Sequence, residues 1–134
     1  MKPVRLLIVA HAPLASALKQ VAQHVFADAA DEVQALDVPA AAGLDEATEA
    51  LGRLRQAHRD AGVDTLVLVD VAGATPSNAC VRALAGDAGA LVLQGVNVPM
   101  VWRALAYRRQ GLSAMADKAR EGAFSGIRPL GATD

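Results

Sequence analysis

The chain has 134 residues, of which 53% are hydrophobic and only 3% aromatic, so we expect one domain, 1–134, with a core of Ala, Val and Leu. The net charge of −1 excludes the strongly basic surface that nucleic acid or an anionic membrane attracts. A single cysteine, Cys80, excludes an internal disulfide framework and favours a reducing cytoplasm.

The first apolar run, "RLLIVA" (5–10), has no period-two alternation, which predicts a strand that is covered on both faces. His11 and Pro13 interrupt it, so the run is too short for a signal peptide or a membrane-spanning helix. Pro13 suits the first position of a helix with an apolar stripe that runs to Val25. Alternation over 32–38 predicts an edge strand, and a second helix is expected over 44–61.

The second fully apolar run, "TLVLVD" (65–70), ends in an acid. Thr75 then suits the N-cap of a helix, with Pro76 as its first residue and Gly86 as its stop. "ALVLQGVNVPM" (90–100) repeats this plan with Pro99. Residues 113–121 have a helical pattern, and 124–130 fit either a short final strand or a loop. The alternation predicts an α/β fold: a doubly wound, four-stranded parallel sheet with helices on both faces.

Three of these strands end in polar residues, namely His11, Asp70 and Asn97. In a parallel sheet these ends lie at one edge, which is where ligands bind in such folds. Three helices are expected to begin at the same edge, and their free N–H groups favour an anion there. No two His or acidic residues have metal-ligand spacing, so we expect no metal site and no cofactor.

The chemistry of this edge favours phosphoryl transfer through a phosphohistidine. Asp70 can accept a hydrogen bond from one nitrogen of a neutral His11 ring and leave the other nitrogen free to attack. The segment "GATPS", which begins with Gly73, Ala74 and Thr75, offers N–H groups and hydroxyls to the transferred anion. We count Asn97 as a fourth candidate for phosphoryl binding.

Each residue also has a plainer role. His11 fits a satisfied polar residue, Asp70 an acceptor at a helix N-terminus, Thr75 a helix cap, and Asn97 a cap or turn residue. The remaining histidines and the cysteine are interpreted as structural: an exposed His24, a His58 whose charged form would suit the end of its helix, and a buried Cys80. Met100 and Trp102 fit the core better than an apolar rim on which a partner docks.

The segments "LLIVAHAPLASAL", "LVLVDVAGATPSNA" and "LQGVNVPM" resemble the mannose-type IIA component of the bacterial sugar phosphotransferase system, over the chain to about residue 125. The resemblance implies that His11 accepts a phosphoryl group from the phosphocarrier HPr and passes it to a IIB component. It further implies that Asp70 hydrogen-bonds His11 and that Thr75 stabilises the phosphoryl group. Ala74 departs from the second glycine that the family usually has, and it would strain the loop if φ were positive there.

The resemblance also implies a homodimer in which a short C-terminal strand, matched by "GIRPL", is exchanged between subunits. No IIB domain is expected within the chain, so the acceptor would be a separate protein. A regulatory IIA protein that binds partners according to its phosphorylation state, and the phosphoryl-donor subunit of a dihydroxyacetone kinase, remain alternatives. A third alternative is a small α/β domain whose sheet edge binds some other anion and transfers no phosphoryl group.

Overall fold

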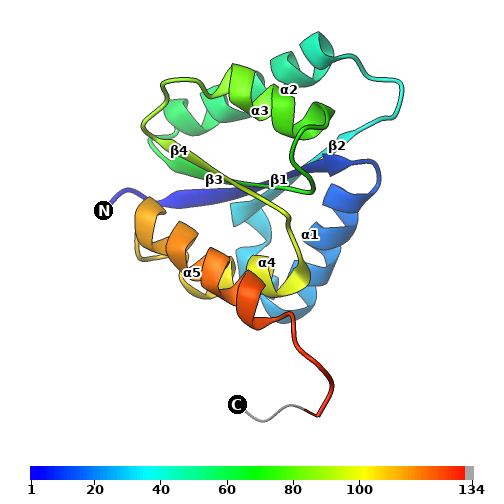
Figure 1. Ribbon diagram of the computed structural model, residues 1–134. Helices are drawn as coiled ribbons and strands as arrows, with labels where there is room; N and C mark the ends of the chain where they lie inside the picture. Colours follow the sequence, from blue (N-terminus) through cyan, green and yellow to red (C-terminus); the bar gives the residue numbers. More distant parts are fainter. Residues whose placement is uncertain (132–134) are drawn as a thin grey trace.

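The fold is a four-stranded parallel sheet between two layers of helices, which confirms the predicted α/β class (Figure 1). The computed structural model describes residues 1–131. The strand order is β2-β1-β3-β4, and every neighbouring pair is parallel. The strands are β1 (Val4–His11), β2 (Val33–Val38), β3 (Asp64–Val69) and β4 (Ala90–Gln94).

The helices divide between the two faces of the sheet, as Figure 1 shows. One face carries α1 (Leu14–Val25), α4 (Val98–Ala106) and α5 (Leu112–Ser125); the other carries α2 (Leu44–Asp60) and α3 (Thr75–Ala83). A short 3₁₀ helix, η1 (Ala27–Glu32), was not predicted and leads into β2. Among residues 1–131, no helix is long and apolar enough to cross a membrane.

Strand β1 shows why the run from Leu6 to Ala10 has no polar residue. Leu6 and Ile8 pack into the core beneath α1, α4 and α5, whereas Leu7 and Val9 pack into the core beneath α2 and α3. All four side chains are fully buried, and burying one such side chain contributes about 2 kcal/mol. Because both faces are covered, the alternation typical of a one-sided sheet is absent.

Strand β4 differs from the buried strand that the sequence indicated. It forms the second edge of the sheet, opposite β2, and its side chains are either partly buried or exposed. Residues 127–130 form neither helix nor strand, and Ile127 and Leu130 are exposed. Up to residue 131, where the described part of the chain ends, no strand follows α5, and the exchange of such a strand between subunits remains a prediction.

Candidate functional site

His11 and Asp70 meet at the carboxyl edge of the sheet, on the two central strands. His11 is the last residue of β1, and Asp70 directly follows β3. The chain leaves β1 towards β2 and leaves β3 in the opposite direction towards β4, so the pair lies at the switch point of the strand order. His11 Nδ1 lies 2.7 Å from Asp70 Oδ2, and the His11 backbone N–H donates to the same oxygen at 3.0 Å.

The Asp70 carboxylate is well suited to remain ionised. Partial burial by itself raises the pKa of Asp70, but hydrogen bonds from the backbone and ring of His11 and from the Val71 N–H outweigh this effect and lower the pKa overall. An ionised carboxylate only accepts hydrogen bonds, so the proton between the two side chains belongs to Nδ1. The lone pair of the ring is then on Nε2, and the side chain of His11 is 49% exposed against 13% for Asp70.

The loop from Gly73 to Thr75 connects Asp70 to helix α3. Gly73 has φ +81°, which favours glycine, whereas Ala74 has φ −102° and ψ 172° and is extended. The strain that a positive φ would have caused at Ala74 is therefore absent. Ala74, and not Thr75, occupies the N-cap position, and Thr75 is the first residue of the helix. The Asn78 side chain donates to the Gly73 carbonyl at 3.4 Å and so supports the loop.

In two of the three helices expected at an anion site, a side chain of the protein binds one N–H of the first turn. At α1, Asp37 on β2 accepts hydrogen bonds from the Ser16 N–H (3.0 Å) and the Ser16 hydroxyl. At α4, Asn97 Oδ1 accepts from the Met100 N–H at 2.9 Å. No side chain caps α3. Of the three helices expected at the anion site, α3 is therefore the one whose first turn has no hydrogen bond from a side chain, and convergence of all three N-termini on an anion remains a prediction.

The side chain of Asn97 is bound outside the His11–Asp70 pair. Asn97 follows β4, which β3 separates from β1, and its Nδ2 donates to the Ala123 carbonyl at 3.2 Å. Both ends of its amide are engaged between α4 and α5, and none of these bonds reaches His11 or Asp70.

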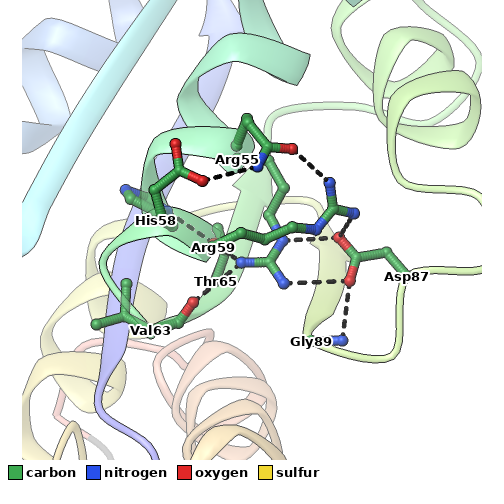
Figure 2. A network of polar contacts seen from close by, with 9 residues as sticks. Arg55, His58, Arg59, Val63, Thr65, Asp87 and Gly89 are labelled. Atoms are coloured by element: carbon green, nitrogen blue, oxygen red, sulfur yellow. Dashed lines mark hydrogen bonds and ion pairs between the residues drawn. The ribbon is translucent and has the colours of Figure 1, made fainter.

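A buried network of polar side chains lies beneath α2 (Figure 2) and was not predicted. The Arg55 guanidinium binds the Asp87 carboxylate through two bonds, of 2.7 and 3.1 Å, and also donates to the Val63 carbonyl at 3.0 Å. Arg59 adds a third bond to Asp87, at 2.8 Å. The hydrogen bonds from Arg55 lower the pKa of Asp87 to about 2. The only available signal was that Arg55 continues the apolar stripe of α2 four residues after Leu51.

His58 belongs to the same buried region and corrects the expectation of a charged side chain. Its Nδ1 lies 2.7 Å from Thr65 Oγ1, and its Nε2 contacts Gln34 Oε1. Burial, and then the nearby charges of Arg55 and Arg5, lower the pKa of His58. The neutral ring therefore joins α2 to β2 and β3.

The remaining candidates have simple environments. His24 is exposed and Cys80 is buried, as expected, and burial raises the pKa of the Cys80 thiol to about 12. Met100 is in the core, whereas Trp102 is partly exposed. Within residues 1–131, no group of three or more His, Cys, Asp or Glu side chains is placed to hold a metal ion.

Comparison with known proteins identifies similar chains. The family model EIIA-man, described as the PTS system fructose IIA component, matches residues 5–120. None of the curated proteins compared with the chain matches it.

Three solved structures share the fold. The mannose/sorbose-specific IIA subunit from Enterococcus faecalis is 24% identical (TM-score 0.85; 100% of this chain and 98% of that chain covered). The phosphotransferase component EIIA from Streptococcus agalactiae is 22% identical (0.80; 95% and 97%). The PTS IIA protein associated with the fucose utilization operon of Streptococcus pneumoniae is 15% identical (0.83; 96% and 94%).

Proposed function

Because the chain belongs to the EIIA-man family of IIA components, its role is phosphotransfer in the sugar phosphotransferase system, and we propose that His11 carries the phosphoryl group. The observation that carries this proposal is the 2.7 Å contact between His11 Nδ1 and Asp70 Oδ2 beside a half-exposed ring. This contact selects the tautomer in which Nε2 is the nucleophile.

The transfer step balances without a metal or a proton acceptor. The Nε2 lone pair attacks the phosphorus of the donor's phosphohistidine, an N–P bond forms at His11, and the donor's N–P bond breaks with its electron pair returning to the donor ring. Nε2 carries no proton before the attack, and Nδ1 keeps its proton, which is hydrogen-bonded to the Asp70 carboxylate. The ring becomes cationic when it is phosphorylated, so the Asp70 carboxylate stabilises the product more than the reactant.

We propose that residues 73–75 and the first turn of α3 bind the phosphoryl group. An uncapped N-terminus carries partial positive charge and favours a dianion. Thr75 adds a hydroxyl at this position. Asn97 is left out of the proposal, because both ends of its amide are bound elsewhere.

The partners of the reaction follow from the family. HPr is the donor, and a IIB component or a regulatory protein is the acceptor, which places the reaction in the cytoplasm. A homodimer is supported by the open edge of β4 and by Ile127 and Leu130, which are exposed in the segment that follows α5.

The experiment is an intact-mass measurement after incubation with phosphoenolpyruvate, enzyme I and HPr. The wild type should gain one acid-labile phosphoryl group only when HPr is present. His11→Ala should gain none and keep its fold, because His11 lies at the surface end of β1. His24→Ala is the matched control, since His24 is also exposed, and it should be phosphorylated normally. Phosphorylation of His11→Ala would refute the assignment.

A further inference from the structure

The first turn of α1 is capped by a residue of the neighbouring strand. Pro13 stands at the N-cap position, and a proline side chain has no hydrogen-bond acceptor. Asp37, which precedes the last residue of β2, takes this role instead: its carboxylate accepts from the Ser16 N–H at 3.0 Å and from the Ser16 hydroxyl. Such a carboxylate satisfies one donor of the first turn and offsets the partial positive charge of the helix end.

This cap lies close to the reactive histidine. The helix begins three residues after His11, a span of at most about 11 Å between Cα atoms. Asp37 is paired with Ala10 in the parallel register, so its Cα lies within about 9 Å of that of His11. The connection between them is fixed, because the Ala12 N–H donates to the Val38 carbonyl at 2.9 Å. The Debye length is about 10 Å at 0.1 M salt, so the charge of Asp37 is only partly screened at His11.

Without the Asp37 carboxylate, α1 would offer a phosphoryl group on His11 a second set of donors. Free N–H groups at the start of a helix bind phosphate, and the Ser16 hydroxyl would add a donor there. In the structure the N–H and the hydroxyl of Ser16 are both used on Asp37. The first turn of α3 has no cap from a side chain, so its partial positive charge is not offset in this way.

The two carboxylates beside His11 act on different parts of the phosphorylated side chain. Strand β1 lies between β2, which carries Asp37, and β3, which Asp70 follows. Asp70 accepts the Nδ1 proton at 2.7 Å and stabilises the cationic ring. Asp37 is bound to α1, so it acts on the phosphoryl dianion through repulsion and through the helix end that it neutralises. The two carboxylates therefore have opposite effects on the phosphorylated form.

We propose that Asp37 is a positioning residue that makes the first turn of α1 unfavourable for the phosphoryl group, so that the group on His11 is held weakly and is passed on readily. This inference rests on the proposed function and adds a residue that sets how firmly the carrier binds the phosphoryl group. Each further charge-assisted hydrogen bond to the phosphoryl oxygens would stabilise the loaded form and oppose its release. In the plainer alternative, Asp37 only stabilises the fold.

The first variant removes the charge of Asp37 and keeps its shape. In Asp37→Asn the amide oxygen still accepts from the Ser16 N–H, and the amide nitrogen donates to the Ser16 hydroxyl oxygen, so α1 keeps its cap. The measurement is the equilibrium constant of phosphoryl transfer between purified HPr and this protein, read by intact mass. A charge at a helix end changes such an equilibrium severalfold, so we expect a shift of about threefold towards phosphorylated His11.

The shift should arise in the return step, in which the N–P bond at His11 breaks, its electron pair stays on Nε2, and a ring nitrogen of HPr forms the new N–P bond. Rapid quenching should therefore show a slower return to HPr in Asp37→Asn. The shift should shrink at about 500 mM NaCl, because salt screens the charge. Nitrogen chemical shifts of the His11 ring should match the wild type, since the contact with Asp70 is unchanged. A changed tautomer would overturn the inference.

Two controls separate the charge from its surroundings. Ser16→Ala removes the hydroxyl bond and keeps the carboxylate and the backbone bond, so it should unfold at a lower urea concentration and leave the transfer equilibrium unchanged. Asp28→Asn removes an equal charge from η1, where the side chain is 77% exposed, and should also leave the equilibrium unchanged. A shift in either control as large as that in Asp37→Asn would overturn the inference.

The same experiment distinguishes the two proposals. Phosphoryl uptake by the wild type, with an equilibrium that Asp37→Asn leaves unchanged or moves towards HPr, would refute the role of Asp37 and keep the carrier role of His11. No uptake by the wild type would refute both.

Discussion

Replacing Asp70 with asparagine tests the chemistry of the site directly. The carboxylate accepts three hydrogen bonds, from the ring and backbone of His11 and from the Val71 N–H. An amide in its place offers one accepting oxygen and one donating nitrogen. If its nitrogen faces the ring, Nδ1 must become an acceptor, and the proton moves to Nε2, the attacking atom.

The size of the effect follows from the lost contact. A hydrogen bond to a charged group contributes about 2 kcal/mol, in the lower part of its range here because the His11 ring is half exposed. Since about 1.4 kcal/mol is tenfold in rate, phosphoryl uptake by Asp70→Asn should slow about 30-fold. The assay is rapid-quench uptake from phosphorylated HPr, with nitrogen chemical shifts of the His11 ring reporting its tautomer. Uptake within twofold of the wild type, in a variant whose ring has changed tautomer, would refute the reasoning.

The other predictions concern the buried network beneath α2. Asp87→Ala should lower the free energy of unfolding by about 3 kcal/mol in a urea titration, because it leaves Arg55 charged and unpaired in the interior; Asp45→Ala, which breaks the exposed pair with Arg82, should change it by less than about 1 kcal/mol. Equal losses in the two variants would contradict this account. The pKa of His58 is lower in the folded protein than the ordinary 6.5, so the unfolded chain binds more protons around and below that pH. The free energy of unfolding should therefore decrease as the pH is lowered below about 6.5. His58→Gln should flatten this pH dependence. Asp87, with a folded pKa of about 2, adds to the loss of stability only below about pH 4. A pH dependence that His58→Gln leaves unchanged would show that another group is responsible.

The parts of the structure that follow from local patterns could be predicted. The apolar runs before His11 and before Asp70 need cover on both faces, and this requirement led to the parallel sheet and to the meeting of the two side chains. Strand β4 shows the limit of such patterns. "ALVLQ" is as apolar as a central strand, yet its place at the edge depends on the order in which strands pair, which no local pattern encodes.

Contacts between residues distant in the sequence could not be predicted either. Arg55 and Asp87 are 32 residues apart, and each belongs to a type that is mostly exposed. Asp37 binds the Ser16 N–H in the first turn of α1 from 21 residues away, so the sequence of the helix itself could not predict this contact. The N-cap of α3 was misplaced by one residue because Ala74 occupies a position that Thr75 would favour by propensity.

The two hydrogen bonds from His11 to one oxygen of Asp70 have an entropic consequence. With its backbone N–H and its ring both held by Oδ2, the imidazole cannot rotate without breaking the ring bond. The rotational freedom of this side chain is therefore lost when the chain folds, and not when a partner arrives. A protein that must react with two partners in turn then presents the same oriented nitrogen to both. In each encounter only the reactive group of the partner still has to be oriented.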